Sequence, residues 1–339
     1  MIEPIVALQR IAFLLERSRE PSYRVKAFRT AAASLDEAGP EQVEALAKTG
    51  RLKDLPGVGD TTAKVVLEAL AGEVPHYLAK LEPTMDAPVV TGGEALRAAL
   101  RGDCHTHSDW SDGGSPIEEM AATGKALGHE YMVLTDHSAR LTIAHGLDRE
   151  RLLRQLDVVA QVNEALAPFR LLTGMEVDIF EDGALDADDD ILERLDVVVA
   201  SVHSKLRMPA DEMTPRMVAA IASPHVDILG HCTGRQVVGR GRPESEFDAD
   251  VIFAACAQTG TAVEINCRPE RLDPPRRLLN LAMEWDCVFS IDTDAHAPGQ
   301  LDWQPYGTSR AEECGVDPAR VVNTWPLEDL LAWTASHNR

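Results

Sequence analysis

The residues that decide the fold are Asp103-Cys104-His105-Thr106-His107-Ser108-Asp109-Trp110-Ser111-Asp112-Gly113. His105 and His107 are two positions apart, so on an extended strand both imidazoles point to the same face. Asp112 follows five residues after His107. Two histidines and a carboxylate at the end of a strand can hold a divalent metal and leave coordination positions open. Alone, such a pair is more often two ordinary surface histidines, so the prediction depends on the sequence downstream.

Downstream, each β-rich run between residues 101 and 339 ends in a polar cluster or leads into one. The runs and clusters are 131–135 with Asp136 and His137, 171–174 with Glu176 and Asp178, 196–202 with His203, 226–230 with His231, 261–265 with Asn266, and 287–291 with Asp294 and His296. Helices are expected between them at 117–127, 149–166, 215–223, 249–258 and 276–285. This alternation predicts parallel βα units, about seven rather than eight. The predicted fold is therefore α/β, a distorted TIM-like (β/α)7 barrel.

In such a barrel the carboxyl ends of all strands open on one face, and that face carries the active site. Six of the 11 histidines lie at strand ends, which packing alone explains poorly: His105, His107, His137, His203, His231 and His296. The other five are predicted not to bind metal, and one of them, His145, is a candidate substrate contact. These five are His76, His129, His145, His225 and His337.

The composition indicates a cytoplasmic protein. Hydrophobic residues make up 45 % of the 339, enough for a conventional core, and the net charge is −22, which excludes a protein that coats polyanions over its whole surface. The N-terminus lacks a basic start followed by an apolar stretch, so no signal peptide is expected, and no run is apolar enough to cross a membrane. The six cysteines are scattered without a C-x-x-C pair, as in a reducing compartment.

Residues 1–82 are predicted to form a small all-α domain, with helical apolar spacing over 5–17, 23–35 and 41–48. The turn Leu55-Pro56-Gly57-Val58-Gly59 opens a further helix, and bare amides at a helix N-terminus form a phosphate site. This stretch resembles a helix-hairpin-helix motif, which grips a nucleic-acid backbone without reading sequence. The candidate DNA-binding residues are Lys53, Gly57, Gly59 and Lys64. A plain helix–turn–helix connection is the alternative, because short Gly-x-Gly matches are common.

The whole of residues 1–82, including Tyr23-Arg24-Val25-Lys26-Ala27-Phe28-Arg29, resembles the N-terminal DNA-binding domain of family-X DNA polymerases. Residues 1–86 hold 11 Lys+Arg against 13 Asp+Glu, a net charge of −2, whereas the remainder carries −20. Only the first part can approach phosphates without strong repulsion. In the lyase-active members of that family this helix carries a Schiff-base lysine. The matching position here is Val65, so no lyase activity is expected.

Residues 83–100 are predicted to be a linker, because Pro83, Pro88, Gly92 and Gly93 interrupt them, with a short helical piece near 94–100. The family-X polymerases place their catalytic palm, a sizeable domain with three carboxylates, at this point. The segment is too short to hold one, so no polymerase activity is expected.

Residues 101–339 resemble the PHP (polymerase and histidinol phosphatase) superfamily, most closely the C-terminal PHP domain of bacterial family-X polymerases. The motifs that carry the resemblance are Arg101-Gly102-Asp103, His105-Thr106-His107, Ser111-Asp112-Gly113, Thr135-Asp136-His137-Ser138, Glu176-Val177-Asp178-Ile179, Ser201-Val202-His203, Gly230-His231, Thr233-Gly234-Arg235, Glu264-Ile265-Asn266 and Asp294-Ala295-His296. The resemblance implies three metals. The first is held by His105, His107, Glu176 and Asp294, the second by Glu176, His203 and His231, and the third by Asp112, His137 and His296.

Up to three divalent transition-metal ions are therefore expected, and imidazole mixed with carboxylate suits Mn, Zn or Fe rather than Ca. Two ions bridged by Glu176 would lie roughly 3.5–4 Å apart and would activate a bridging water for attack on phosphorus. Glu176, Asp294 and Arg235 are the predicted catalytic residues, with Arg235 either a phosphate clamp or a salt bridge on the barrel rim. The sequence does not decide whether three neighbouring polar residues orient a ligand or have a purely structural role: Asp136, Asp178 and Asn266.

Three functions follow from these features. The first is a metal-dependent phosphoesterase that hydrolyses phosphodiester or phosphomonoester bonds at DNA ends, as a 3'-5' exonuclease or an end-processing repair nuclease. The second is a small-molecule phosphatase of the histidinol-phosphate type, which the acidic barrel favours because its walls repel a long polyanion. The third is a non-catalytic DNA-binding scaffold, against which the complete ligand set argues. The expected partners are DNA, through the first domain, and a phosphate-ester substrate, with no membrane.

Overall fold

The computed structural model describes residues 2–337, and the chain divides into two compact units at Val89/Val90. The segment predicted as a linker is shared between them. Arg17 of the first unit donates to the carbonyl oxygens of Thr84 (2.7 Å) and Ala87 (2.9 Å). In the second unit, the Gly93 amide donates to Glu312 at 2.8 Å. These hydrogen bonds place residues 83–89 in the first unit and residues 90–100 in the second.

The first unit is helical, as predicted. Its helices are α1 (Pro4–Arg17), α2 (Ser22–Ala38), α3 (Pro40–Lys48), α4 (Asp60–Leu70) and α5 (His76–Leu81). The apolar positions that predicted α1 are buried, among them Leu8, Ile11 and Leu15. Buried residues spaced three and four apart form one stripe of a helix, and this stripe faces α2 and α4.

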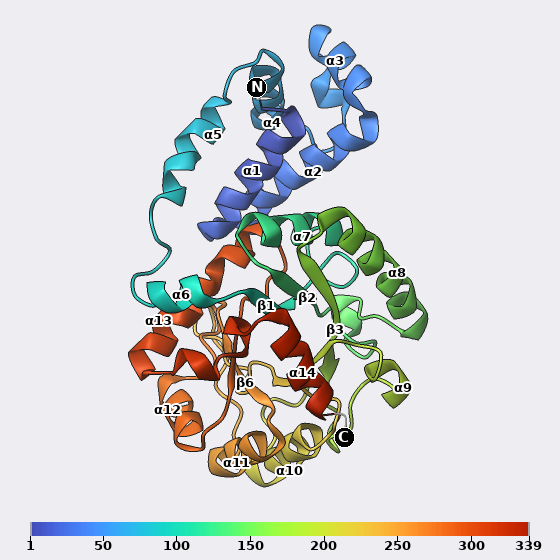
Figure 1. The fold of residues 1–339 in the computed structure, drawn as a ribbon. Coiled ribbons are helices and arrows are strands. Elements are labelled where there is room, and N and C mark those ends of the chain that lie inside the picture. The colour runs from blue at the N-terminus through green and yellow to red at the C-terminus, as the bar shows by residue number, and fades with distance from the viewer. Residues whose placement is uncertain (1, 338–339) are drawn as a thin grey trace. The chain divides into compact units, whose positions relative to one another are not determined.

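The second unit is the predicted barrel, with seven parallel strands in the order of the chain. The strands are β1 (Gly102–Thr106), β2 (Tyr131–Leu134), β3 (Arg170–Asp178), β4 (Val197–Ser201), β5 (Ile228–Leu229), β6 (Ala262–Asn266) and β7 (Phe289–Asp292). The helices between them are α7 (Ile117–Ala126), α8 (Arg149–Leu166), α9 (Asp189–Leu192), α10 (Ala210–Ile221), α11 (Ala249–Thr259) and α12 (Arg276–Glu284). Figure 1 shows these helices around the strands.

The strands are buried on both faces. All five residues of β4, Val-Val-Val-Ala-Ser, are buried, and so are those of β1, β2, β6 and β7. Burial along the whole strand is typical of parallel strands that lie between a barrel interior and a layer of helices. The polar residues therefore concentrate where the strands end, and this positions the site.

Side chains close the barrel between β1 and β7. The Cys104 amide donates to the Asp292 carboxylate at 2.7 Å, and Thr293 donates to Asp103 through its hydroxyl at 2.5 Å. Beyond the strand ends, the His107 amide donates to the Ala295 carbonyl oxygen at 2.8 Å. This seam fixes the His105–His107 strand beside the Asp294–His296 loop.

The structure differs from the predicted helices in its boundaries and in helices that were not predicted, among them α5 and α9. Helix α10 begins at Ala210, five residues before the predicted start at Pro215, because a proline inside a helix reads as its beginning. Two further helices lie beyond residue 296 and were not predicted, namely α13 (Gln304–Cys314) and α14 (Leu327–His337). Among the residues described, no helix is both long and apolar enough to cross a membrane.

Candidate metal centre

The fold brings the nine predicted ligands together at the carboxyl ends of the strands. They come from β1 and the loop after it (His105, His107, Asp112), from the end of β2 (His137), from β3 (Glu176), and from the segments after β4, β5 and β7 (His203, His231, Asp294, His296). Three sets of their ligand atoms each lie within 4.8 Å of one another. Residues spread over 192 positions of the chain thus face one small volume.

Glu176 lies at the middle of this cluster, and its two oxygens face different histidines. Oε2 is 3.3 Å from His105 Nε2 and 2.9 Å from His137 Nδ1. Oε1 is 2.9 Å from His231 Nε2 and 3.2 Å from His203 Nε2. A carboxylate with one oxygen toward each group has the arrangement needed to bridge two cations.

Eight of the nine ligands form three adjoining groups. His107, Asp112, His137 and His296 make one, in which Asp112 Oδ1 is 3.2 Å from His296 Nε2. His105, His107 and Asp294 make the second, and His137, Glu176 and His203 a third. The groups overlap at His107 and His137, whereas the ligand sets implied by resemblance assign each of these histidines to one metal only.

The donor atoms fit transition metals. Within residues 2–337, several buried nitrogen and oxygen atoms of this cluster make no hydrogen bond: His105 Nε2, both ring nitrogens of His107 and of His203, and Glu176 Oε2. Buried polar atoms without partners are costly, and they are expected where an ion completes the site. Imidazole and carboxylate donors together suit Mn, Zn or Fe.

Charge interactions keep the carboxylates ionised. Burial acts to raise the pKa of Glu176, but the neighbouring His105, His203 and His137 hold it well below its usual value. The same applies to the pKa of Asp294, where burial is outweighed by Arg268 and His107. Burial, together with the charge of Arg271, lowers the pKa of His231 to about 4, so its imidazole is neutral. At His105 and His203 burial is outweighed by Glu176 and by a second carboxylate, Glu264 or Asp178, which raise the pKa of these two histidines. Because neutral imidazoles and ionised carboxylates are the forms that bind metals, metal binding would release protons from these two rings.

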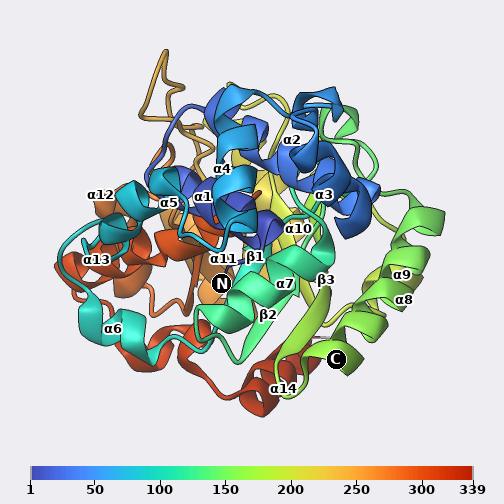
Figure 2. The same cartoon turned by 90° about the horizontal axis from the view of Figure 1, so that it is seen from above.

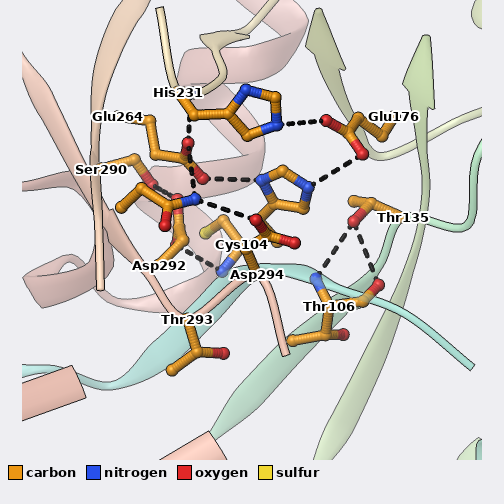
Figure 3. A network of polar contacts seen from close by, with 12 residues as sticks. Cys104, Thr106, Thr135, Glu176, His231, Glu264, Ser290, Asp292, Thr293 and Asp294 are labelled. Carbon is orange, nitrogen blue, oxygen red and sulfur yellow. Dashed lines mark hydrogen bonds and ion pairs between the residues drawn. The ribbon is translucent and has the colours of Figure 1, made fainter. Parts of the chain in front are cut away.

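A ring of polar residues orients the ligands. Glu264 Oε1 accepts a hydrogen bond from His105 Nδ1 at 2.6 Å, and its Oε2 accepts from the His231 amide at 2.5 Å. Asn266 donates to both Glu264 and Asp294, in each case at 3.2 Å. Figure 3 shows Glu264 and Glu176 on opposite sides of this cluster. From the sequence, Glu264 was recognised only as part of a motif and was given no role. An acidic residue in a buried strand end was the signal that could have identified it as a residue that orients the ligands.

Asp136 and Asp178, whose roles the sequence left undecided, occupy different positions. Asp178 Oδ1 is 3.3 Å from His203 Nδ1 and accepts from the His203 amide, so it faces a ligand. Asp136 instead accepts from the Ser108 amide (2.8 Å) and from the Ser111 hydroxyl. It therefore holds the loop that connects His107 to Asp112.

Three arginines lie near the centre, and Arg235 has the rim salt bridge that was one of its two expected roles. Arg235 donates to the carbonyl oxygens of Arg271 and Leu272 and pairs with Glu244 at 3.4 Å, so its guanidinium is engaged on the rim. Arg271 Nε is 3.2 Å from Asp294 Oδ2, and Arg268 Nη1 is 2.9 Å from the Asp294 carbonyl oxygen. Arg268 and Arg271, which the sequence left unassigned, are the cations that face the ligands.

The other five histidines lie outside the three groups. His129 is buried without a hydrogen bond from its ring among the residues described, whereas His145 is exposed in the loop after β2. His337 Nδ1 is 2.9 Å from Asp227, which directly precedes β5. His225 lies 3.7 Å from Asp189, and His76 begins α5 of the first unit.

The hairpin of the first unit is already partly engaged. The Gly59 amide donates to Thr62 Oγ1 at 2.9 Å, and the Val58 amide donates to the Leu55 carbonyl oxygen at 3.2 Å. Lys53 pairs with Asp60 at 2.8 Å, and Lys64 lies 3.8 Å from Glu68. These two amides are therefore not bare, and each predicted DNA-binding lysine has an acidic neighbour that phosphate would have to displace.

A parallel barrel with a histidine–carboxylate cluster at the carboxyl ends of its strands, preceded by a helix-hairpin-helix unit, defines a metal-dependent phosphoesterase architecture. The chain belongs to the PHP domain family. The model of the PHP domain matches residues 103–267, and the model of a helix-hairpin-helix domain matches residues 3–74.

The chain is similar to two curated relatives and to one solved structure. "DNA polymerase/3'-5' exonuclease PolX" of Bacillus subtilis (strain 168) is 36 % identical over 300 residues, 88 % of this chain, and the chain spans about half (51 %) of that protein. A protein named "Probable phosphatase" from Thermoanaerobacter sp. (strain X514) is 32 % identical over 233 residues, 66 % of this chain and 89 % of that one. A histidinol phosphate phosphatase structure from Lactococcus lactis is 14 % identical and covers 70 % of this chain and 92 % of its own, with a TM-score of 0.40.

Proposed function

We propose that this chain hydrolyses phosphodiester bonds at DNA ends, as a 3'-5' exonuclease or an end-processing repair nuclease. One observation carries the proposal: the helix-hairpin-helix unit and the nine convergent ligands, eight in the three groups and His231 beside Glu176, belong to one chain. The resemblance to PolX supports it, because that protein's name includes a 3'-5' exonuclease and the match extends over 88 % of this chain. A phosphatase of small molecules has no use for the helical unit.

The residues divide the chemistry among them. Nine side chains would hold up to three Mn, Zn or Fe ions, which supply acidified water and polarised phosphoryl oxygens when bound. Glu176 spans the two groups of histidines through its separate oxygens. Glu264 holds the Nδ1 proton of His105, so that Nε2 is left for a metal. Arg268 and Arg271 bring positive charge to the Asp294 side, where they can bind phosphate oxygens.

A small-molecule phosphatase is the second candidate function. Two observations favour it: a relative named "Probable phosphatase" matches 233 residues, and residues 87–339 carry a net charge of −20. Three divalent ions reduce that to about −14, which still opposes a long polyanion. A non-catalytic scaffold, the third candidate, predicts a protein without stable metal binding.

One assay panel tests the proposal. The full chain, loaded separately with Mn, Zn and Fe, is given labelled single-stranded DNA, duplex DNA with an abasic site, and histidinol phosphate. We expect shortening of labelled DNA and weak turnover of histidinol phosphate. Rapid release of phosphate from histidinol phosphate with intact DNA would instead establish the small-molecule function. Tightly bound metal with no turnover of any substrate would contradict both.

A further inference from the structure

The segment after β5 forms a narrow hairpin that carries arginines. Residues 233–243, here called the arginine hairpin, contain Arg235, Arg240 and Arg242 and no acidic residue. Gln236 and Arg242 pair in antiparallel fashion, each amide donating to the other's carbonyl oxygen at 2.9 and 2.8 Å. Gly239 and Gly241 have φ values of 71° and 66°, which suit glycine in a tight turn. Figure 2 shows this hairpin as a protruding gold loop.

The tip of the hairpin exposes two neighbouring valines. Val237 and Val238 are 49 % and 47 % exposed. In the described part of the second unit, five large hydrophobic side chains are exposed, and three of them lie on loops that follow strands: Ile143, Val237 and Val238. A single exposed valine needs no explanation, but an adjacent pair on a protruding turn is typical of a contact surface.

The arginine hairpin packs against the loop that reaches the metal centre. The Val237 amide donates to the Glu270 carbonyl oxygen at 2.7 Å, and Arg235 Nε donates to that of Arg271 at 3.0 Å. The Arg271 side chain in turn lies 3.2 Å from Asp294. Arg242 Nε donates to the Gly234 carbonyl oxygen, which holds this guanidinium at the base of the hairpin. Cations thus continue from the ligands onto the hairpin.

This basic stretch contrasts with the unit that carries it. Residues 233–243 carry three arginines and no acid, whereas residues 90–339 hold 22 Lys+Arg against 42 Asp+Glu, and over the longer stretch from 235 to 277 seven arginines are balanced by seven acidic residues. A local net positive charge in an otherwise acidic unit favours the approach of phosphates to the hairpin. The positive charge of the hairpin also offsets, at this place, the electrostatic repulsion between the acidic barrel and a long polyanion.

The hairpin is longer than is needed to contact a single phosphate. About three residues separate the Gln236–Arg242 pair from the tip, an extended length of roughly 10 Å. That length exceeds the spacing of neighbouring phosphates along a strand, so the hairpin can reach beyond the terminal nucleotide. A phosphomonoester would be served by Arg268 and Arg271 alone, because these two face the ligands.

We propose that the arginine hairpin holds the unpaired end of the nucleic-acid strand whose terminal phosphodiester lies at the metal centre. Arg240 contacts phosphates, and Val237 and Val238 contact the faces of unpaired bases. The inference rests on the proposed function and names its substrate more closely as a single-stranded end. Aliphatic side chains can reach base faces only where the bases are unstacked, which is why an unpaired strand fits better than a duplex.

Two variants of the full, Mn-loaded chain test the inference, Arg240→Gln and the double variant Val237→Ser/Val238→Ser. Arg240 is exposed and has no ion pair among residues 2–337, so its loss leaves the fold unchanged. The matched controls are Arg154→Gln on α8 and Val251→Ser on α11, both exposed in the same unit. Each protein is assayed on a single-stranded oligonucleotide, on an abasic oligomer of equal length, and on bis(p-nitrophenyl) phosphate.

We expect Arg240→Gln to lower kcat/KM on the oligonucleotide roughly three- to tenfold, as for one lost contact to a charged group. The slope of log(kcat/KM) against log salt should become shallower by about 0.7. The valine variant should lower kcat/KM on the normal oligomer but not on the abasic one. Turnover of bis(p-nitrophenyl) phosphate and both controls should stay within about twofold of the unmodified chain.

The failures of the two proposals are distinguishable. If the unmodified chain hydrolyses bis(p-nitrophenyl) phosphate but no nucleic acid, the proposed DNA function fails and the inference with it. If DNA is cleaved and neither hairpin variant differs from its control, the inference alone is wrong. An equal loss on all three substrates would show that the hairpin supports the metal centre and does not hold a strand, which also overturns it.

Discussion

Glu264 lies between His105 and the backbone of His231, with its two oxygens 2.6 Å from His105 Nδ1 and 2.5 Å from the His231 amide nitrogen. One buried carboxylate therefore orients ligands that come from β1 and from the segment after β5. His105 Nδ1 is engaged by this contact, and its Nε2 faces Glu176. The pairing of a carboxylate with the outer nitrogen of a histidine fixes the tautomer that binds metal.

Glu264→Gln should lower metal affinity and activity by about 10- to 100-fold. An amide has only one accepting oxygen, so the substituted side chain cannot accept from both His105 and His231. Metal content after dialysis and hydrolysis of bis(p-nitrophenyl) phosphate are the measurements. Glu284→Gln, an exposed acid at the end of α12, is the control and should match the unmodified chain. Unchanged metal retention in the Glu264 variant would show that its hydrogen bonds do not orient the ligands.

Glu176→Ala should abolish hydrolysis and reduce the number of bound metal ions. Its two oxygens face separate histidine groups, so the change removes a donor from both at once. Without the carboxylate, its neighbouring histidines also lose the negative charge that stabilises a cation between them. Elemental analysis and phosphate release are measured on the same preparation. Full activity in this variant would contradict the role of Glu176 as a ligand shared by two metal ions.

The chain should not extend a primer with any nucleotide or metal. Residues 83–89 are bound to the first unit and residues 90–100 to the second, so no chain is left between them for a palm. Primer extension on a templated duplex, with PolX-type polymerase as the positive control, is the assay. Template-directed products from a preparation free of other polymerases would contradict the expectation.

Gly59→Val should weaken DNA binding by about tenfold, because a side chain there holds the phosphate backbone away from the helix N-terminus. A Cβ at Gly59 meets no atom within 4 Å, whereas one at Gly57 would lie 2.4 Å from Thr30 Cγ2. The Gly57 change would therefore disturb the fold and is unsuitable as a probe.

Asp60→Asn should change the DNA affinity in the opposite direction in the same experiment. Asp60 is exposed at the first position of α4 and pairs with Lys53, so removing its charge should tighten DNA binding. Both affinities are measured by titration of labelled DNA at two salt concentrations. Equal affinity in both variants and the unmodified chain would show that DNA does not contact this turn.

The buried His129 should make the barrel less stable in acid. Burial, assisted by Arg97, lowers its pKa to about 3 from an ordinary 6.5. The unfolded chain therefore binds the extra proton between these values, and stability is full above pH 6.5 and falls as the pH drops toward 3. Between pH 7 and pH 5 this one group should cost about 2 kcal/mol.

His129→Leu should remove that part of the pH dependence, and His145→Asn, an exposed histidine, should retain it. Urea unfolding at pH 7 and pH 5 gives the difference for each protein. The metal-binding histidines titrate alike in all three proteins, so their effect cancels in the comparison. An identical loss of stability in the His129 variant would show that this residue does not titrate as described.

The sequence was sufficient for the barrel and for the identity of the convergent residues. Strand runs such as Val197–Ser201 are continuous and apolar, and each is followed by a histidine, aspartate or asparagine. Both patterns are local, because the period of a strand and the residue at its end can be read without knowing its neighbours. The shared direction of parallel strands then forces those ends onto one face.

Side-chain partners were decided by the tertiary structure alone. Arg235 follows His231 closely in sequence, yet it turns to the carbonyl oxygens of Arg271 and Leu272, and Arg271 takes the position beside Asp294. The sequence predicted a bare Gly59 amide, whereas in the structure Thr62 Oγ1 accepts a hydrogen bond from it.

The same applies to the division of Glu176 between two groups of histidines. Its contacts join residues 27 to 71 positions away along the chain, and no periodicity records them. The order of residue types along the sequence determines which groups reach the end of the barrel. Which oxygen meets which nitrogen depends on rotamers that packing from distant segments selects.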